Sequence, residues 1–76
     1  MILKKGHRSD LVKKLQTSLA SLGFHPGPID GHFGPATESA VEDFQTRNRL
    51  LADGVVGRDT FLALSASGYD LIAGIS

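Results

Sequence analysis

Apolar residues recur at helical spacing in three segments of the chain, and these segments define the elements that we expect. The first segment contains a stripe of five: Leu11, Val12, Leu15, Leu19 and Leu22. This spacing places all five on one face of an α-helix of about four turns. Ser9 is a good N-cap for that helix, Asp10 lies favourably near the positive end of its dipole, and Gly23 suits the left-handed position that ends many helices.

Two further helices are predicted, each after a glycine-rich loop. The second begins near Pro35, which the first helical turn tolerates because the missing N–H would have no partner there. Its expected buried face consists of Ala36, Ala40, Val41 and Phe44, and its expected outer face of Glu38, Glu42, Asp43 and Arg47. The third helix is shorter and covers residues 58–66, and Gly68 ends it. Its apolar positions are Phe61, Leu62 and Leu64.

The segments outside the helices are expected to be irregular but anchored in the core. The first eight residues form an extended lead-in, and two prolines and a glycine forbid regular structure after the first helix. The residues expected to anchor these segments and the later connection are Ile2, Leu3, Phe24, Ile29 and one of Leu50 or Leu51.

We therefore expect a mainly α fold, a small three-helix bundle with two glycine-rich loops. Short β-bridges between the two loops are expected because Ile29-Asp30 and Val55-Val56 favour extended backbone. Residues 1–68 form the domain. Residues 69–76 leave three interpretations open: a last helical turn, a packed tail, or the start of a linker.

The two loops carry the same sequence pattern. Residues 30–37 and residues 53–60 both read D-G-x-x-G-x-x-T. The aspartate can accept backbone N–H groups two or three residues on, and the first glycine can take a positive φ angle. The second glycine can do the same or lie against a close neighbour, and the threonine can bond back towards the loop. Loop architecture thus accounts for all four repeated positions, and direct ligand contact is the alternative.

A metal site in these loops is not supported by the residues. An EF-hand-type calcium loop needs oxygen ligands at its third and fifth positions. Counted from each aspartate, those positions hold His32 and Gly34 in the first copy and Val55 and Gly57 in the second. His25, Asp30 and His32 lack the spacing of a helical zinc site, so exposed loop histidines are the simpler interpretation. We therefore expect no metal and no cofactor.

Composition narrows the classes of function. The chain has 76 residues, no cysteine and a formal net charge of +0, which suits one small domain without disulfides or a thiol nucleophile. The balanced charge argues against nucleic acid as a partner, and we interpret the basic clusters Lys4-Lys5 with His7-Arg8 and Lys13-Lys14 as solvated surface. No apolar run approaches the ~20 residues of a membrane span.

Catalysis by this chain is not indicated either. There is no G-x-S-x-G elbow to present a nucleophilic serine. A chain of this size also leaves little volume for a pocket that excludes water. We therefore expect no catalytic residues and a protein that binds a ligand without transforming it.

An ordered set of motifs resembles one family. In chain order the motifs are Gly6, Val12-x-x-Leu15-Gln16-x-x-Leu19, Leu22-Gly23-Phe24, Asp30-Gly31-x-Phe33-Gly34-Pro35-x-Thr37-x-x-Ala40-Val41-x-x-Phe44-Gln45, and Asp53-Gly54-x-Val56-Gly57-x-x-Thr60-x-x-Leu64. This order is similar to that of the peptidoglycan-binding domain of the three-helix type, over about residues 3–66. Leu11 stands where the family usually has an acidic or small residue, and we interpret it as additional core packing.

The resemblance implies a non-catalytic module that binds bacterial peptidoglycan and anchors a wall-cutting enzyme, such as an amidase or a phage lysin. It implies a shallow groove near the repeated loops and the start of the second helix. The candidate ligand contacts are His32, Phe33, Gln45, Arg47, Asn48 and Arg58. A structural role is the alternative for each: Phe33 as core, the arginines as plain surface, and the amides of Gln16 and Gln45 as ties between helix and loop backbone.

The resemblance leaves several aspects of function open. A protein–protein interaction module on the same scaffold is the alternative function. The ligand is expected to be the glycan, the stem peptide or both, bound by a monomer linked to a catalytic domain that acts in the bacterial cell wall or periplasm. Lys4-Lys5 interrupt the apolar start, so we expect no secretory signal, as for a phage lysin or an excised domain.

Overall fold

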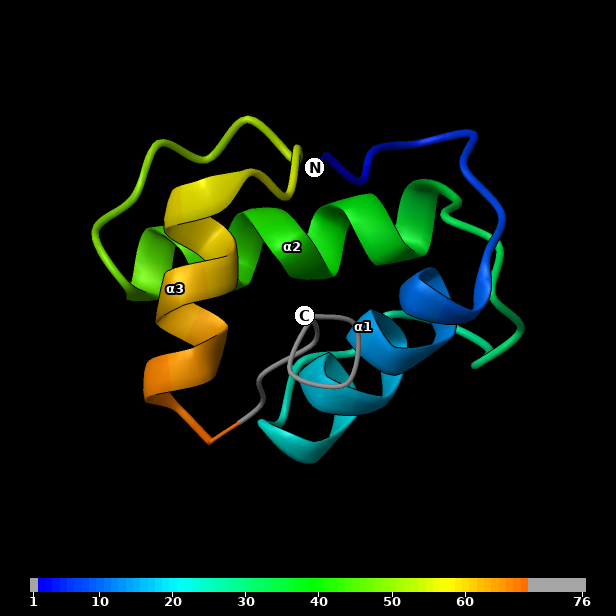
Figure 1. The fold of residues 1–76 in the computed structure, drawn as a ribbon, viewed down its shortest axis with the longest axis horizontal. Coiled ribbons are helices and arrows are strands. Elements are labelled where there is room, and N and C mark those ends of the chain that lie inside the picture. Colours follow the sequence, from blue (N-terminus) through cyan, green and yellow to red (C-terminus); the bar gives the residue numbers. More distant parts are fainter. Residues whose placement is uncertain (1, 69–76) are drawn as a thin grey trace.

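The computed structural model describes residues 2–68, so the interpretations of residues 69–76 lie outside the described residues. The described residues form three helices: α1 (Asp10–Ser21), α2 (Pro35–Arg47) and α3 (Arg58–Ala66). In the view of Figure 1, α2 spans the molecule, α3 crosses one end of it, and α1 lies below the other end. The predicted three-helix bundle is confirmed, as are the bounds of the third helix.

The first helix begins and ends where the sequence predicts. The Ser9 hydroxyl oxygen accepts a hydrogen bond from the backbone N–H of Val12 at 3.2 Å, which satisfies one donor that the helix itself cannot pair. After the helix, Gly23 takes a φ angle of +93°. These local signals define α1 because each acts within one turn of the chain.

The core forms where the three helices meet. Its buried apolar side chains are Leu3, Val12, Leu15, Leu19, Phe33, Ala40, Val41, Phe44, Val56, Phe61 and Leu64. Three predicted core positions are wrong. Ala36 is exposed because the buried face of α2 starts one residue later, at Thr37. Ile2 and Ile29 are 54% and 43% exposed, so neither anchors its segment in the core. Of the two alternatives Leu50 and Leu51, Leu50 is half-buried and Leu51 is 81% exposed.

The prediction for the second glycine of each loop is also wrong. Gly34 and Gly57 have φ angles of −101° and −102°, so neither is left-handed. A Cβ atom added to either would meet nothing within 4 Å. Both residues are instead the N-caps of the following helices, α2 and α3.

The extended lead-in pairs with both loops, which corrects the expectation that the loops pair with each other. Leu3 bridges Val56 of the second loop, and Arg8 bridges His32 of the first, both in antiparallel fashion. Figure 1 shows the lead-in, in blue, running along the edge of the molecule to α1. The lead-in therefore satisfies backbone groups of both loops that no helix can reach.

Candidate ligand-binding surface

One buried amide holds the first repeated loop against α1. The side chain of Gln16 is 0% exposed. Its Nε2 donates to Asp30 Oδ1 at 3.2 Å, the His32 carbonyl at 3.0 Å and Thr37 Oγ1 at 3.1 Å. Its Oε1 accepts the backbone N–H groups of Asp30 at 3.1 Å and Gly31 at 2.9 Å. A single side chain thus replaces the water that this loop would otherwise bind.

The same arrangement occurs at the second repeated loop. Gln45 Nε2 donates to Asp53 Oδ1 at 3.1 Å, the Val55 carbonyl at 2.9 Å and Thr60 Oγ1 at 3.1 Å. Its Oε1 accepts the Gly54 backbone N–H at 3.0 Å. The interpretation of both glutamines as ties between helix and loop is confirmed. Within the described residues, every buried side-chain nitrogen and oxygen has a hydrogen-bond partner.

The aspartate and first glycine of each loop have the predicted roles. Asp30 Oδ1 accepts the His32 N–H at 2.9 Å, and Asp53 Oδ1 accepts the Val55 N–H at 2.9 Å. Gly31 and Gly54 have φ angles of +78° and +74°, where a side chain is disfavoured. The two loops are therefore rigid supports for the residues between their repeated positions.

Asp30 makes the first loop sensitive to acid. The backbone N–H of His32, and then the amide of Gln16, hold the pKa of Asp30 below its ordinary value of 3.8. A carboxyl group whose pKa is depressed by folding contributes stability above the unfolded-state pKa and loses it as the pH falls through the folded-state pKa. We therefore expect the free energy of unfolding to decrease below about pH 4.

Asp30→Asn should reduce this acid-dependent decrease, because asparagine keeps an acceptor oxygen but does not titrate. The measurement is urea unfolding of both proteins between pH 7 and pH 2.5. The expected result is a shallower decrease for the variant below pH 4. Parallel curves for the two proteins would show that Asp30 is not linked to folding.

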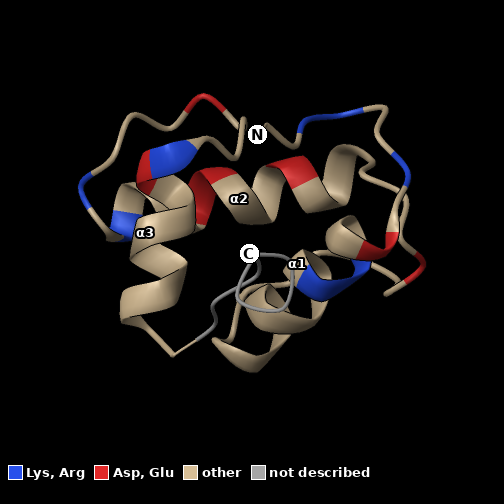
Figure 2. Ribbon diagram, viewed as in Figure 1, with Lys and Arg blue, Asp and Glu red and all other residues tan. Residues whose placement is uncertain are grey.

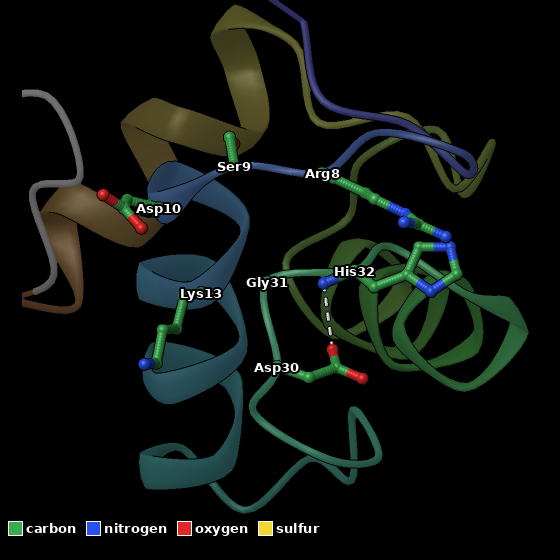
Figure 3. Close-up of a pocket in the computed structure, with 7 residues that line it drawn as sticks. All are labelled: Arg8, Ser9, Asp10, Lys13, Asp30, Gly31 and His32. Carbon is green, nitrogen blue, oxygen red and sulfur yellow. Dashed lines mark hydrogen bonds between the residues drawn. The ribbon is translucent and has the colours of Figure 1, made fainter.

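Two neighbouring hollows flank the first loop. The larger, of about 600 Å³, is polar and is lined by Arg8, Ser9, Asp10, Lys13, Asp30, Gly31 and His32 (Figure 3). The smaller, of about 180 Å³, is mostly apolar and is lined by Pro26, Pro28, Asp30, His32, Gly34, Pro35, Ala36 and Thr37. Asp30 and His32 belong to both, so we call the two hollows together the first-loop groove.

A third hollow, of about 240 Å³, lies at the second loop. It is lined by Gln45, Leu50, Leu51, Asp53, Val55, Gly57, Arg58, Asp59 and Thr60. We call it the second-loop hollow. Leu51 is largely exposed and Leu50 half-buried, so this hollow combines an apolar wall with the cation of Arg58.

The six candidate contacts from the sequence fall into three groups. His32 is exposed and lies in the middle of the first-loop groove. Arg58 lines the second-loop hollow. Phe33 and Gln45 are 0% and 1% exposed, so their side chains offer no surface to a polymer. Burial assigns those two to the core and to the loop support.

The other two candidates are exposed near the end of α2 and already contact the protein. The guanidinium of Arg47 lies 5.9 Å from the centre of the Phe24 ring. Asn48 Nδ2 donates to the Phe44 carbonyl at 2.9 Å and so caps α2. Figure 2 shows basic residues at the end of α2, in the following loop and at the start of α3, which together form one end of the molecule.

Sequence reasoning missed several residues that line the first-loop groove, above all Arg8 and Lys13. Both belong to basic clusters that we interpreted as solvated surface. Arg8 reaches the groove only because the lead-in pairs with the first loop through the bridge to His32. No periodicity or local motif in the sequence indicates that pairing.

The described residues contain neither a candidate metal site nor a candidate membrane span. Within residues 2–68, no three histidine, aspartate or glutamate side chains are grouped so that they could hold a metal ion. None of the helices in that range has the length and apolar content needed to cross a membrane.

Comparison with known proteins identifies the family. Residues 8–64 match the family described as "Putative peptidoglycan binding domain". The fold is similar to the crystal structure of the SleB N-terminal domain, with a TM-score of 0.84 and 33% identity over 88% of this chain and 92% of that one. A Burkholderia AP3 phage endolysin matches 88% of this chain and 26% of its own, with a TM-score of 0.82 and 39% identity. The chain belongs to this peptidoglycan-binding-domain family.

Among curated proteins, the chain is similar to an N-acetylmuramoyl-L-alanine amidase, CwlM, from Mycobacterium tuberculosis. The two are 44% identical over 55 residues, which are 72% of this chain and 14% of the amidase. A zinc D-Ala-D-Ala carboxypeptidase from Streptomyces albus G is 42% identical over 64 residues, or 24% of its length. The chain thus corresponds to one part of these longer enzymes. These comparisons favour a wall-binding module, and nothing in them supports the alternative of a protein–protein interaction module.

Proposed function

We propose that this domain binds bacterial peptidoglycan without cleaving it and keeps an attached wall hydrolase on its substrate. The observation that supports this proposal best is the family match over residues 8–64, because it covers both repeated loops, the whole of α1 and α2 and most of α3. The relatives named as amidase and endolysin are longer than the matched region, which fits a separate catalytic part.

The proposed contact surface comprises the four candidates that remain accessible. His32 contributes from the first-loop groove, and Arg58 contributes from the second-loop hollow. Arg47 and Asn48 are exposed at the end of α2 and complete the proposed surface. Phe33 and Gln45 act indirectly, because their burial holds the loops in place.

We also propose how the domain is connected to its parent protein and where it acts. Residues 1–68 form a monomeric binding domain, and residues 69–76 form a tail or the start of a linker to a hydrolase that works in the cell wall or periplasm. Each shallow hollow is open to solvent, so single contacts should be weak. Retention on a dense polymer comes from repeated rebinding at high local ligand concentration.

Co-sedimentation with purified, protein-free sacculi tests the binding function. The folded domain should pellet with sacculi, and the turbidity of the suspension should stay constant because nothing is cleaved. Folded domain that remains in the supernatant would refute the binding proposal. A fall in turbidity with this chain alone would refute the non-catalytic part.

His32→Ala and Arg58→Ala should each lower the affinity for sacculi about two- to fivefold, as expected for the loss of one exposed polar or charged contact. Lys14→Ala is the control, because Lys14 is exposed on α1 and lines none of the three hollows. Pelleted fractions measured across a range of sacculus concentrations give the affinities. Equal affinities for all four proteins would place the contact surface elsewhere.

A further inference from the structure

We propose that Arg8 and His32 together bind a carboxylate of the peptidoglycan stem peptide, and that the apolar half of the first-loop groove takes alanine methyl groups of the same peptide. This inference rests on the proposed wall-binding function and adds Arg8 as a binding residue. It also assigns the first-loop groove to the peptide and not to the glycan.

The backbone pairing brings the two side chains together. The Phe33 N–H donates to the His7 carbonyl at 2.9 Å, and the Ser9 N–H donates to the Gly31 carbonyl at 3.0 Å. These two bonds enclose Arg8 and His32, which are therefore a non-hydrogen-bonded antiparallel pair. Side chains approach each other most closely in this kind of pair and project to the same face.

The charges around this pair favour an anion. Across residues 2–68 the one ion pair is Lys5 with Glu38 at 3.8 Å, so no described carboxylate forms an ion pair with Arg8. Two basic side chains on directly opposite residues of an antiparallel pair repel each other when both are charged. A carboxylate between them removes that repulsion and accepts a bidentate bond from the guanidinium.

Of the two acidic residues of the polar hollow, Asp10 lies away from this pair and Asp30 lies on the same side as the pair (Figure 3). Figure 3 shows the side chains of Arg8 and His32 directed away from Asp10 and Lys13, which lie across the first turn of α1. Asp30 Oδ1 is occupied by the His32 N–H and the Gln16 amide. These two donors offset part of the negative charge next to His32.

The apolar half of the first-loop groove indicates which chemical groups lie next to the carboxylate in the ligand. Beyond His32 the walls are formed by Pro26, Pro28, Pro35 and Ala36, which are small and apolar. Neither hollow is lined by phenylalanine or tyrosine, the flat faces on which sugar rings pack. A stem peptide carries carboxylates close to alanine methyl groups, so it matches a basic pair beside a proline wall.

An NMR titration of the 76-residue chain tests the assignment. The probes are a soluble stem pentapeptide with free carboxylates, the same peptide with both its glutamyl and its terminal carboxylates amidated, and glycan strands freed of peptide by an amidase. Two further peptides, each amidated at only one of these positions, would show whether the glutamyl or the terminal carboxylate is bound. We expect the free-carboxylate peptide to shift the amide signals of Arg8 and residues 31–33, and amidation to weaken binding about fivefold.

Arg8→Gln should weaken binding of the free-carboxylate peptide to the same degree and abolish the difference between the two peptides. Lys14→Gln is the matched control, since it removes one positive charge from α1 outside the groove and should leave that difference intact. His32→Gln gives a second test at the other half of the pair.

The inference is overturned if the stripped glycan shifts these amides, if amidation has no effect, or if the peptide fails to bind at millimolar concentration. If sacculi still pellet the domain in those cases, the wall-binding function stands and only the peptide assignment falls. If sacculi fail to pellet the folded domain, the proposed function itself falls. The outcomes for the two proposals are therefore distinct.

Discussion

Gln16→Ala is expected to lower the free energy of unfolding by about 3–5 kcal/mol, because it leaves several buried groups without a partner at a cost of about 1–3 kcal/mol each. Those groups are the His32 carbonyl and the backbone N–H groups of Asp30 and Gly31. A small domain has a total stability of about 5 kcal/mol. The variant should therefore be largely unfolded or melt at a much lower temperature.

Chemical unfolding followed by circular dichroism measures this loss. Thr17→Ala is the matched control, because Thr17 is the next residue of α1, is exposed, and bonds only to the Lys13 carbonyl within its own helix. We expect it to change stability by less than about 0.5 kcal/mol. A loss below about 1 kcal/mol for Gln16→Ala would show that water replaces the amide at little cost.

Gln45→Ala should behave like Gln16→Ala, since the second amide makes the equivalent contacts with Asp53, Val55, Thr60 and Gly54. The comparison is informative because the two networks tie different helices to different loops. A large loss at one glutamine and a small loss at the other would show that only one of the loops is essential for folding.

Gly31→Ala is expected to have the largest effect after the two glutamine variants, about 2–4 kcal/mol, because two costs add. The φ angle of +78° disfavours any side chain by about 1 kcal/mol. The new Cβ would also lie 3.0 Å from the backbone carbonyl oxygen of Ser9, which cannot rotate away. Ser9 is the N-cap of α1 and is bonded to Gly31 itself, so the clash would be transmitted to the start of that helix.

Two other glycines separate these costs. Gly23→Ala meets the left-handed penalty alone, since its φ angle is +93° and the space around its Cβ is open. It should lose about 1 kcal/mol. Gly34→Ala meets neither cost, because its φ angle is −101° and no atom lies within 4 Å, so it should stay near the stability of the parent. Equal losses for Gly31 and Gly23 would show that the Ser9 backbone yields.

These stability predictions bear on function because the glutamine ties support the surface proposed to bind the wall. His32 is attached to Gln16 through its carbonyl and to Asp30 through its N–H, so its backbone is held by hydrogen bonds on both sides. A binding residue held in this way loses little conformational freedom when a ligand arrives. Partial loosening of the first loop should therefore weaken binding before it unfolds the domain.

The sequence alone determined those features whose physical causes act over a few residues. Ser9 and Gly23 define the ends of α1 through a cap and a left-handed turn, and the spacing of Leu15 and Leu19 defines its buried face. The aspartate and first glycine of each repeated loop behave as their side chains require. The ordered motifs were also sufficient to indicate the family.

Only the tertiary structure decided features that depend on contacts between distant segments. Whether Gln16 and Gln45 face a ligand or a loop depends on where residues 14 and 8 positions away, respectively, return to the helix. Ile29 and Leu51 are as apolar as the core residues but are turned outwards by loops held through their backbone. From the sequence, Arg8 was interpreted as plain surface. Pairing of the lead-in with the first loop places it opposite His32. The sequence does not indicate this pairing, because strand register is set by partners that lie far apart in the chain.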